Sequence, residues 1–352
     1  MLFGGGNSII GIDVGSSAVK IVMLKLGKQP VLAGFGIAHL PMEGVIVEGN
    51  IVDGAAVTDT IKDVIKAGKL KGSTYVGGLL SQNTIIRFIK MPVMAADELK
   101  EAIKFEAEQY IPYSIDEVQI SYFNLGEIAE EEGSQNYILL VCTPKEILNT
   151  YQITLKNAGV TLKVVDVDCF GVLNALSAQV DPDGIVAIID IGASTTNIDI
   201  IKRGVLDFHR NVNIAGNNIS NVIKDVLKLE LSQAENIKKE EGRVAIEESD
   251  RNEVSDVINT IIEELVSEIR RSFDFFKAQS REKQIDKIIL TGGTSKLPNI
   301  DAFLANELGI EVEFADPFVD LGVSVPNMDE LEEYKQELTA AIGLGLREVV
   351  RK

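Results

Sequence analysis

The feature that most constrains the fold is a hairpin pattern that occurs twice. Residues 187–201 read AIIDIGASTTNIDII, in which two apolar runs flank a turn of small and hydroxyl residues, and Asp190 lies near the end of the first run. Residues 9–24, IIGIDVGSSAVKIVML, have the same pattern, and Asp13 corresponds to Asp190. Because the two copies lie about half a chain apart, they predict two similar α/β domains that each begin with a hairpin.

Length and composition agree with two domains that each bury a core. The chain has 352 residues, and one domain usually takes about 150. Apolar residues at spacings of three and four between residues 252 and 276 predict a helix that packs into the core of the second domain. The net charge of -19 opposes attraction to nucleic-acid phosphates and anionic lipids, so we expect neither as a principal partner.

The cysteines and histidines form no recognisable catalytic or metal-binding motif. Cys142 and Cys169 lack CxxC spacing and are expected to be buried free thiols. His39 and His209 are far apart in sequence, which argues against a His-based metal site and places each at the surface or in a loop. The chain opens without a positively charged signal region, and no apolar run reaches the ~18 residues that span a bilayer, so we expect a cytoplasmic protein.

The chemistry of the two turns suits a phosphate chain with a divalent cation. Gly15 and Gly192 let the backbone approach a ligand closely. Consecutive N–H groups could converge on one anion, together with the hydroxyls of Ser16, Ser17, Ser194, Thr195 and Thr196. A carboxylate repels phosphate unless a cation intervenes, and Mg2+ prefers carboxylates, waters and substrate phosphates. We therefore predict that Asp13 and Asp190 hold Mg2+ through water, and that Lys20 offers positive charge to the β- and γ-phosphates.

Two further segments could complete a nucleotide site. Residues 287–300, KIILTGGTSKLPNI, predict a strand, a Gly292-Gly293 loop and a helix whose N-terminus favours negative charge. Residues 232–242, SQAENIKKEEG, predict a short helix with Glu235 and Lys238 on one face. Taken alone, residues 287–300 could be a tight strand-to-helix connection, and residues 232–242 could be a solvated charged helix. The sequence does not support a P-loop or Rossmann fold, because it contains no Walker A or GxGxxG motif.

Together these segments resemble the nucleotide-binding motifs of the actin/Hsp70/sugar-kinase superfamily. GIDVGSSAVK is similar to phosphate-1, IIDIGASTTNIDI to phosphate-2, AENIKKEEG to the ribose and adenine helix, and ILTGGTSKLPNI to the adenosine motif. The resemblance implies an actin-like (ribonuclease H-like) fold of duplicated α/β domains that binds ATP and Mg2+. It implies that Mg2+ and phosphates are held by Asp13, Gly15, Ser16, Ser17, Lys20, Asp190, Gly192, Thr195 and Thr196. It also implies that Glu235 and Lys238 reach the nucleoside, against which Gly292, Gly293 and Thr294 pack.

The middle of the chain narrows the resemblance to one branch. The strands and helices expected between residues 31 and 159 resemble the 1C subdomain shared by the cell-division protein FtsA and the pilus assembly protein PilM. Four stretches are similar to the PilM family in particular: Leu2-Phe3, 106–119, 163–176 and 340–347. The resemblance implies subdomain 1A at 1–30, 160–182 and 338–352, 1C at 31–159, 2A at 183–214 and 284–337, and 2B at 215–283.

PilM proteins bind ATP and the short cytoplasmic N-terminal tail of the membrane protein PilN. The resemblance therefore implies a scaffold of type IV pilus assembly, peripheral to the inner membrane, that reaches the membrane only through a partner. The tail is expected in a groove between 1A and 1C, and other pilus assembly proteins are expected partners. An FtsA-like division filament, a competence or type II secretion component, and a sugar kinase remain alternatives.

Two departures from the superfamily pattern bear on ATP turnover. Ala193-Ser194 stands where many relatives have a Gly-Gly pair, which reduces backbone freedom beside the γ-phosphate. Asn197 stands where actin has a histidine, so a water-orienting group is missing there. Asp166 or Asp168 are candidates to polarise water, although either could simply cap the following helix. We expect slow hydrolysis at most.

Overall fold

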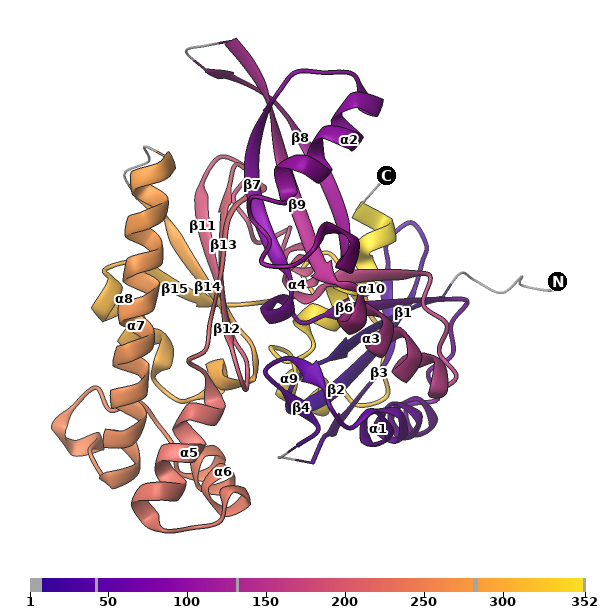
Figure 1. Cartoon of the computed structure of the whole chain (residues 1–352). Coiled ribbons are helices and arrows are strands. Elements are labelled where there is room, and N and C mark those ends of the chain that lie inside the picture. Colours follow the sequence, from indigo (N-terminus) through magenta and orange to yellow (C-terminus); the bar gives the residue numbers. More distant parts are fainter. Residues whose placement is uncertain (1–7, 42–43, 131–132, 281–283, 351–352) are drawn as a thin grey trace.

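The computed structural model describes residues 8–41, 44–130, 133–280 and 284–350. Two sheets lie in separate halves of the molecule (Figure 1). The first contains β1 (Ser8–Val14), β2 (Ala18–Lys25), β3 (Val31–His39), β6 (Thr74–Leu79), β10 (Val164–Val167) and β16 (Gly322–Val323). The second contains β11 (Ile185–Ile191), β12 (Thr196–Lys202), β13 (Val205–Val212), β14 (Lys287–Thr291) and β15 (Glu311–Phe314).

The two sheets repeat one topology. Their strand orders are β3-β2-β1-β6-β10, with β16 beside β3, and β13-β12-β11-β14-β15. In each, the first three strands in chain order are antiparallel neighbours and the later two are parallel additions. The turns also close alike, since Gly15 N–H donates to the carbonyl of Ala18 and Gly192 N–H to that of Thr195, both at 3.0 Å. This confirms the predicted duplicated, actin-like α/β fold.

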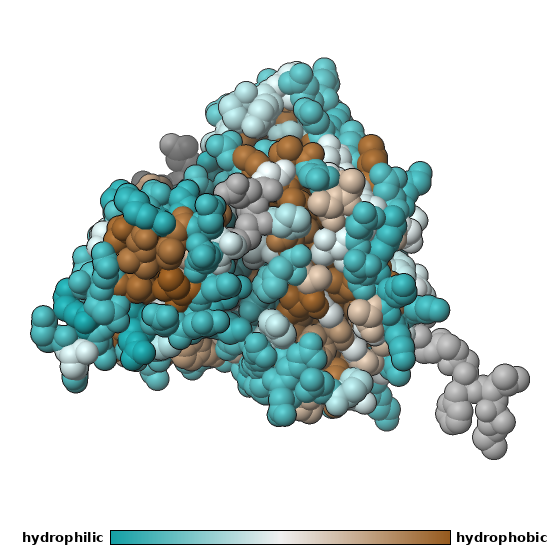
Figure 2. Space-filling view, turned by 90° about the horizontal axis from the view of Figure 1, so that it is seen from below, coloured by the Kyte–Doolittle hydropathy of each residue, from teal (hydrophilic) through white to brown (hydrophobic). Residues whose placement is uncertain are grey.

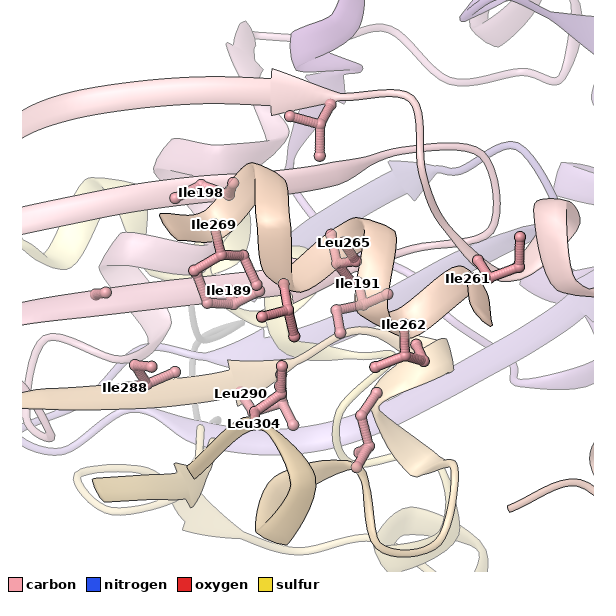
Figure 3. Close-up of a cluster of buried hydrophobic side chains, with 14 of the residues drawn as sticks. Ile189, Ile191, Ile198, Ile261, Ile262, Leu265, Ile269, Ile288, Leu290 and Leu304 are labelled. Atoms are coloured by element: carbon pink, nitrogen blue, oxygen red, sulfur yellow. The ribbon is translucent and has the colours of Figure 1, made fainter. Parts of the chain in front are cut away.

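A long helix provides much of the core of the second half. Helix α7 (Glu253–Ser280) packs on one face of the second sheet, as its apolar spacing predicted. Figure 3 shows Ile189, Ile191 and Ile198 from the sheet facing Leu265 and Ile269 from α7. Three shorter helices complete this half: α5 (Gly216–Leu227), α6 (Leu231–Glu240) and α8 (Ile300–Leu308).

Seen from the end where α5 and α6 lie, the second half exposes an apolar area surrounded by hydrophilic residues (Figure 2). The exposed apolar side chains of this half include Val226 and Ile246. Among the helices within the described ranges, none is both long and apolar enough to cross a lipid bilayer.

The first half has helices on both faces of its sheet. Helices α1 (Gly54–Ala67) and α3 (Lys145–Asn157) cover one face, and α4 (Asp168–Ala175) and α10 (Thr339–Val350) lie on the other, toward the second sheet. Helices α4 and α10 touch through backbone, because a Cβ on Gly343 would lie 1.6 Å from the carbonyl oxygen of Gly171. Helix α9 (Met328–Glu333) and the ribbon of β4 (Ile46–Val47) and β5 (Asn50–Ile51) are also present.

A third sheet stands apart from these two halves. Strands β7 (Ile85–Pro92), β9 (Gly133–Pro144) and β8 (Val118–Glu130) form it in that order, and α2 (Ala96–Ala107) packs against it (Figure 1). The predicted range of 31–159 for subdomain 1C is therefore too wide, because β3 and β6 hydrogen-bond into the first sheet. We keep the name 1C for β7–β9 and α2. Leu2 and Phe3, cited for the family resemblance, lie outside the described residues.

Candidate functional site

The two hairpin turns meet at one cavity between the halves of the molecule. Its volume is about 70 Å3. The predicted residues that line it are Asp13, Gly15, Ser16, Ser17, Lys20, Asp168, Asp190, Gly192, Thr195, Gly292 and Gly293, with Ala193, Ser194 and Asn197 beside them. Each turn lies where the first strand of its sheet ends, and the packing of the two halves brings both turns to this cavity.

Among the described residues that line this cavity, Lys20 is the cation. Its Nζ lies 3.0 Å from Oδ2 of Asp13, and the side chains are 13% and 8% exposed. Burial lowers the pKa of Lys20, but the charges of Asp13, Glu337 and Asp190 outweigh that effect and leave the pKa raised. Lys20 is therefore held in its charged form, as a phosphate-binding lysine must be.

The ionised form of Asp190 is disfavoured in this cavity. The pKa of its carboxyl is raised from 3.8 to about 6, mainly by burial and also by the charges of Asp13 and Asp199. Lys20 and a hydrogen bond from Asn197 oppose this shift. A divalent cation between Asp13 and Asp190 would favour both ionised carboxylates, and hard oxygen donors are what Mg2+ prefers. These residues fit the predicted Mg2+ site.

The third predicted loop approaches the second hairpin through a glycine. Gly292 has φ +88° and ψ 161°, a conformation that essentially only glycine adopts. A Cβ there would lie 2.3 Å from Oδ1 of Asp190 and 2.4 Å from the carbonyl oxygen of Ile191. Thr294 then donates to the carbonyl oxygen of Gly192 at 2.7 Å, although it does not line the cavity.

Thr196 does not face the cavity, contrary to its predicted contact with phosphate. Its hydroxyl is fully buried and donates to the carbonyl oxygen of Ile214 at 2.7 Å. Side chains alternate along a strand, so Thr195 and Asn197 point into the cavity and Thr196 points to the other side.

Glu235 and Lys238 form a buried network beside the second hairpin instead of lining the cavity. Lys238 Nζ donates to Oε2 of Glu235 at 2.6 Å, to the Ser220 hydroxyl at 3.0 Å and to the carbonyl of Gly216 at 3.2 Å. Burial lowers the pKa of Lys238, despite the opposing charge of Glu235. The Gly216 N–H in turn donates to the carbonyl of Gly192 at 3.2 Å, which joins this network to the hairpin.

The structure separates the two candidate water-polarising residues. Asp166 forms an ion pair with Arg347 of α10 and does not line the cavity. Asp168 begins α4, lines the cavity, and accepts a hydrogen bond from the Cys169 N–H at 2.6 Å. Only Asp168 is in position to contact a ligand there.

Sequence reasoning missed the segment that leads into α10, from which Gln336, Glu337 and Thr339 also line the cavity. It also missed Thr291 at the end of β14. The hydroxyls of Thr291 and Thr339 lie 3.0 Å apart, and Glu337 accepts from Lys296 at 3.2 Å. No local pattern marks Gln336, Glu337 and Thr339, because they reach the site only where the chain returns to the first half.

A second, larger cavity lies between the first sheet, the β4–β5 ribbon and α3, and 1C reaches it through Pro144 at the end of β9. Its volume is about 380 Å3, and it is lined by Val14, Ile46, Gly49, Asn50, Ile51, Leu79, Leu80, Asn83, Tyr113, Pro144, Glu146, Ile147, Thr150 and Tyr151. Glu146 is the charged residue among these. The buried Nδ2 of Asn83 has no hydrogen-bond acceptor among the described residues. Leu80 lines both cavities, so the two are neighbours.

His209 does not lie in a loop or at the surface, as its sequence context suggested. It is on β13 with its side chain 5% exposed, and its Nδ1 lies 2.6 Å from Oδ1 of Asp199. Both cysteines are buried free thiols, as predicted. Cys169 lies close to this His–Asp pair.

Comparison with known proteins places this architecture among actin-like proteins. A sequence model described as type IV pilus assembly protein PilM matches residues 11–349. A solved PilM-PilN type IV pilus biogenesis complex contains a chain 29% identical, with a TM-score of 0.87 over 97% of this chain and 98% of that one. FtsA of Bacillus subtilis is 24% identical over 88% of this chain and 78% of its own. MreB5 of Spiroplasma citri bound to AMPPNP is 14% identical, with a TM-score of 0.54 over 98% and 97%.

Proposed function

Because the chain belongs to the PilM family of type IV pilus assembly proteins, we propose that it is a Mg-ATP-binding scaffold that holds the N-terminal tail of a PilN-like membrane protein. Nucleotide binding is supported by the meeting of two acidic hairpins, since Asp13 and Asp190 line one cavity beside Lys20. The likeness to a solved PilM-PilN complex supports the partner half.

In this proposal the chain's own residues bind and position the nucleotide. Asp13 and Asp190 hold Mg2+ through water, Lys20 donates to the phosphates, and the turn N–H groups bind phosphate oxygens. Mg2+ neutralises phosphate charge when bound. A cavity of about 70 Å3 is smaller than the about 300–1,000 Å3 of most small-molecule sites. The two halves therefore move apart to admit ATP.

ATP hydrolysis is slow at most in this proposal. Asn197 accepts a hydrogen bond from Asn211 Nδ2 at 2.7 Å, and an amide cannot take a proton from water as a general base does. Asp168 is the remaining candidate to polarise water in the cavity. The nucleotide then acts mainly to hold the two halves in one relative orientation.

The tail binds in the larger cavity, between the first sheet, the β4–β5 ribbon and α3. Its volume of about 380 Å3 lies within the range of small-ligand sites. Its walls combine apolar side chains such as Ile46 and Leu79 with polar groups, and Glu146 offers one negative charge. A carbonyl group of the tail would satisfy the unpaired Nδ2 of Asn83, and buried donors are seldom left unpaired. The protein reaches the membrane through this partner.

Two titrations of the full chain test nucleotide binding and tail binding separately. Calorimetry with Mg-ATP is expected to show saturable binding that Asp13→Ala abolishes and Asp63→Ala, an exposed carboxylate of α1, preserves. A labelled peptide with the N-terminal tail sequence of the PilN-like protein from the same genome is expected to bind with saturation. If the wild-type protein does not bind Mg-ATP, the proposed nucleotide binding is wrong. If it does not bind the peptide, the proposed PilN-like partner is wrong. ATP-dependent filaments without peptide binding would favour an FtsA-like role.

A further inference from the structure

Three side chains with metal-binding atoms converge at the boundary between the two halves. The Sγ of Cys169, a carboxylate oxygen of Asp199 and a ring nitrogen of His209 all lie within 4.8 Å of one another. They come from α4 in the first half and from β12 and β13 in the second. None of the three lines the nucleotide cavity or the cavity beside 1C.

The cluster is buried and contains an unpaired carboxylate oxygen. Asp199 and Cys169 have no exposed surface, and the His209 side chain is 5% exposed. Oδ1 of Asp199 is paired with His209 Nδ1 at 2.6 Å, but Oδ2 has no hydrogen-bond partner among the described residues. Leaving a fully buried carboxylate oxygen unpaired costs free energy, and a bound cation would remove that cost.

The atom types select the class of cation. Thiolate, imidazole and carboxylate are the ligands of Zn2+, whereas Mg2+ and Ca2+ prefer oxygen alone. This separates the cluster from the Mg2+ site at Asp13 and Asp190.

We propose that Cys169, Asp199 and His209 bind one Zn2+ ion, which joins α4 of the first half to the second sheet. Three protein ligands leave a fourth position, which a water molecule fills. Because the ligands come from both halves, the bound ion restrains their relative movement behind the nucleotide cavity. The site is independent of the proposed tail partner.

Co2+ is the probe that reports thiolate ligation directly. Full-length protein is stripped with a chelator and titrated with Co2+, and one equivalent is expected to produce thiolate-to-cobalt charge-transfer absorption that Zn2+ then displaces. Cys169→Ser and His209→Gln are expected to lose this absorption. Cys142→Ser removes the other buried thiol, which lies on β9, and is expected to keep it.

The outcomes decide the proposal in either direction. Saturable Co2+ binding that depends on Cys169 and His209 but not on Cys142 supports it. Wild-type protein that gives no charge-transfer absorption, or an absorption that Cys169→Ser retains, overturns it. A second measurement applies if Cys169→Ser or His209→Gln does not fold. Zn2+ is expected to raise the Tm of the wild type and of Cys142→Ser. An unchanged Tm in both proteins also overturns the proposed site.

Discussion

Lys20 and Asp13 face each other as register partners on β1 and β2, with Nζ 3.0 Å from Oδ2. The corresponding partner of Asp190 on β12 is Asn197, which carries no charge. One hairpin of the cavity therefore has its own cation, and the other does not. Burial is the main cause of the raised pKa of Asp190, and it is opposed only by Lys20 of the other hairpin and by the uncharged Asn197.

Replacing Lys20 tests whether that cation binds phosphate. Lys20→Met is expected to weaken Mg-ATP binding about 10- to 100-fold, because a hydrogen bond to a charged group contributes about 1.5–3 kcal/mol. Lys25→Met, on the same strand with an exposed side chain, is the control and is expected to bind normally. Calorimetric titration measures both. Equal affinity of Lys20→Met and wild type would remove Lys20 from the phosphate site.

Asp190 links stability to pH in the metal-free protein. Its pKa in the folded state is about 6, above the ordinary 3.8, so the folded state binds the proton more tightly than the unfolded state does. The ionised carboxylate therefore costs stability above about pH 6, by at most about 3 kcal/mol. This cost disappears as pH falls from about 6 toward 4.

Asp190→Asn removes this cost while weakening Mg-ATP binding. Urea denaturation without Mg2+ is expected to show the variant more stable than wild type at pH 8, with the difference shrinking toward pH 5. Asp183→Asn, an exposed aspartate just before β11, serves as the control. A variant that is less stable than wild type at every pH would contradict the assigned role of Asp190.

Gly292 should tolerate no side chain. Gly292→Ala is expected to lower the free energy of unfolding by at least about 3 kcal/mol, because it adds both backbone strain and overlap with Asp190. Gly204→Ala isolates the strain, since Gly204 has φ +74° with no atom within 4 Å of the added Cβ, and should cost about 1 kcal/mol. Equal losses in urea denaturation would show that the close approach at Gly292 is unimportant.

Substitution of Asn83 should weaken tail binding without affecting folding. Its Nδ2 has no acceptor among the described residues, so Asn83→Ala should leave stability nearly unchanged while weakening the tail peptide about two- to tenfold. Fluorescence anisotropy measures the affinity, and Gln152→Ala, at an exposed position on α3, is the control. If Asn83→Ala binds the peptide like wild type, the tail makes no hydrogen bond to Asn83.

Local pattern was enough for the duplicated hairpins and for α7. Each depends on periodicity within one segment. The hairpin motifs indicated the actin-like superfamily, and stretches elsewhere, such as 106–119 and 163–176, indicated the PilM family. The same reasoning led to Asp13, Lys20 and Asp190, because each lies at a fixed place within a hairpin.

Features that depend on pairing between distant segments were not predictable in this way. The hydrogen bonds of β3 and β6 with β2 and β1 overturned the predicted extent of 1C. The side-chain alternation that turns Thr196 away from the cavity depends on where β12 begins. Glu337 reaches the cavity, and Cys169 reaches His209, only through the complete tertiary fold.

The close contact of α10 with α4 and β1 also constrains the order in which the chain can fold during synthesis. The second sheet with α5–α8 occupies one continuous stretch, residues 185–314, and can assemble as soon as that stretch leaves the ribosome. The first half waits for residues 339–350, because α10 packs against β1 and α4. Until then β1 lacks the helix that covers one side of it, so apolar residues such as Ile9 remain without their packing partner Leu344.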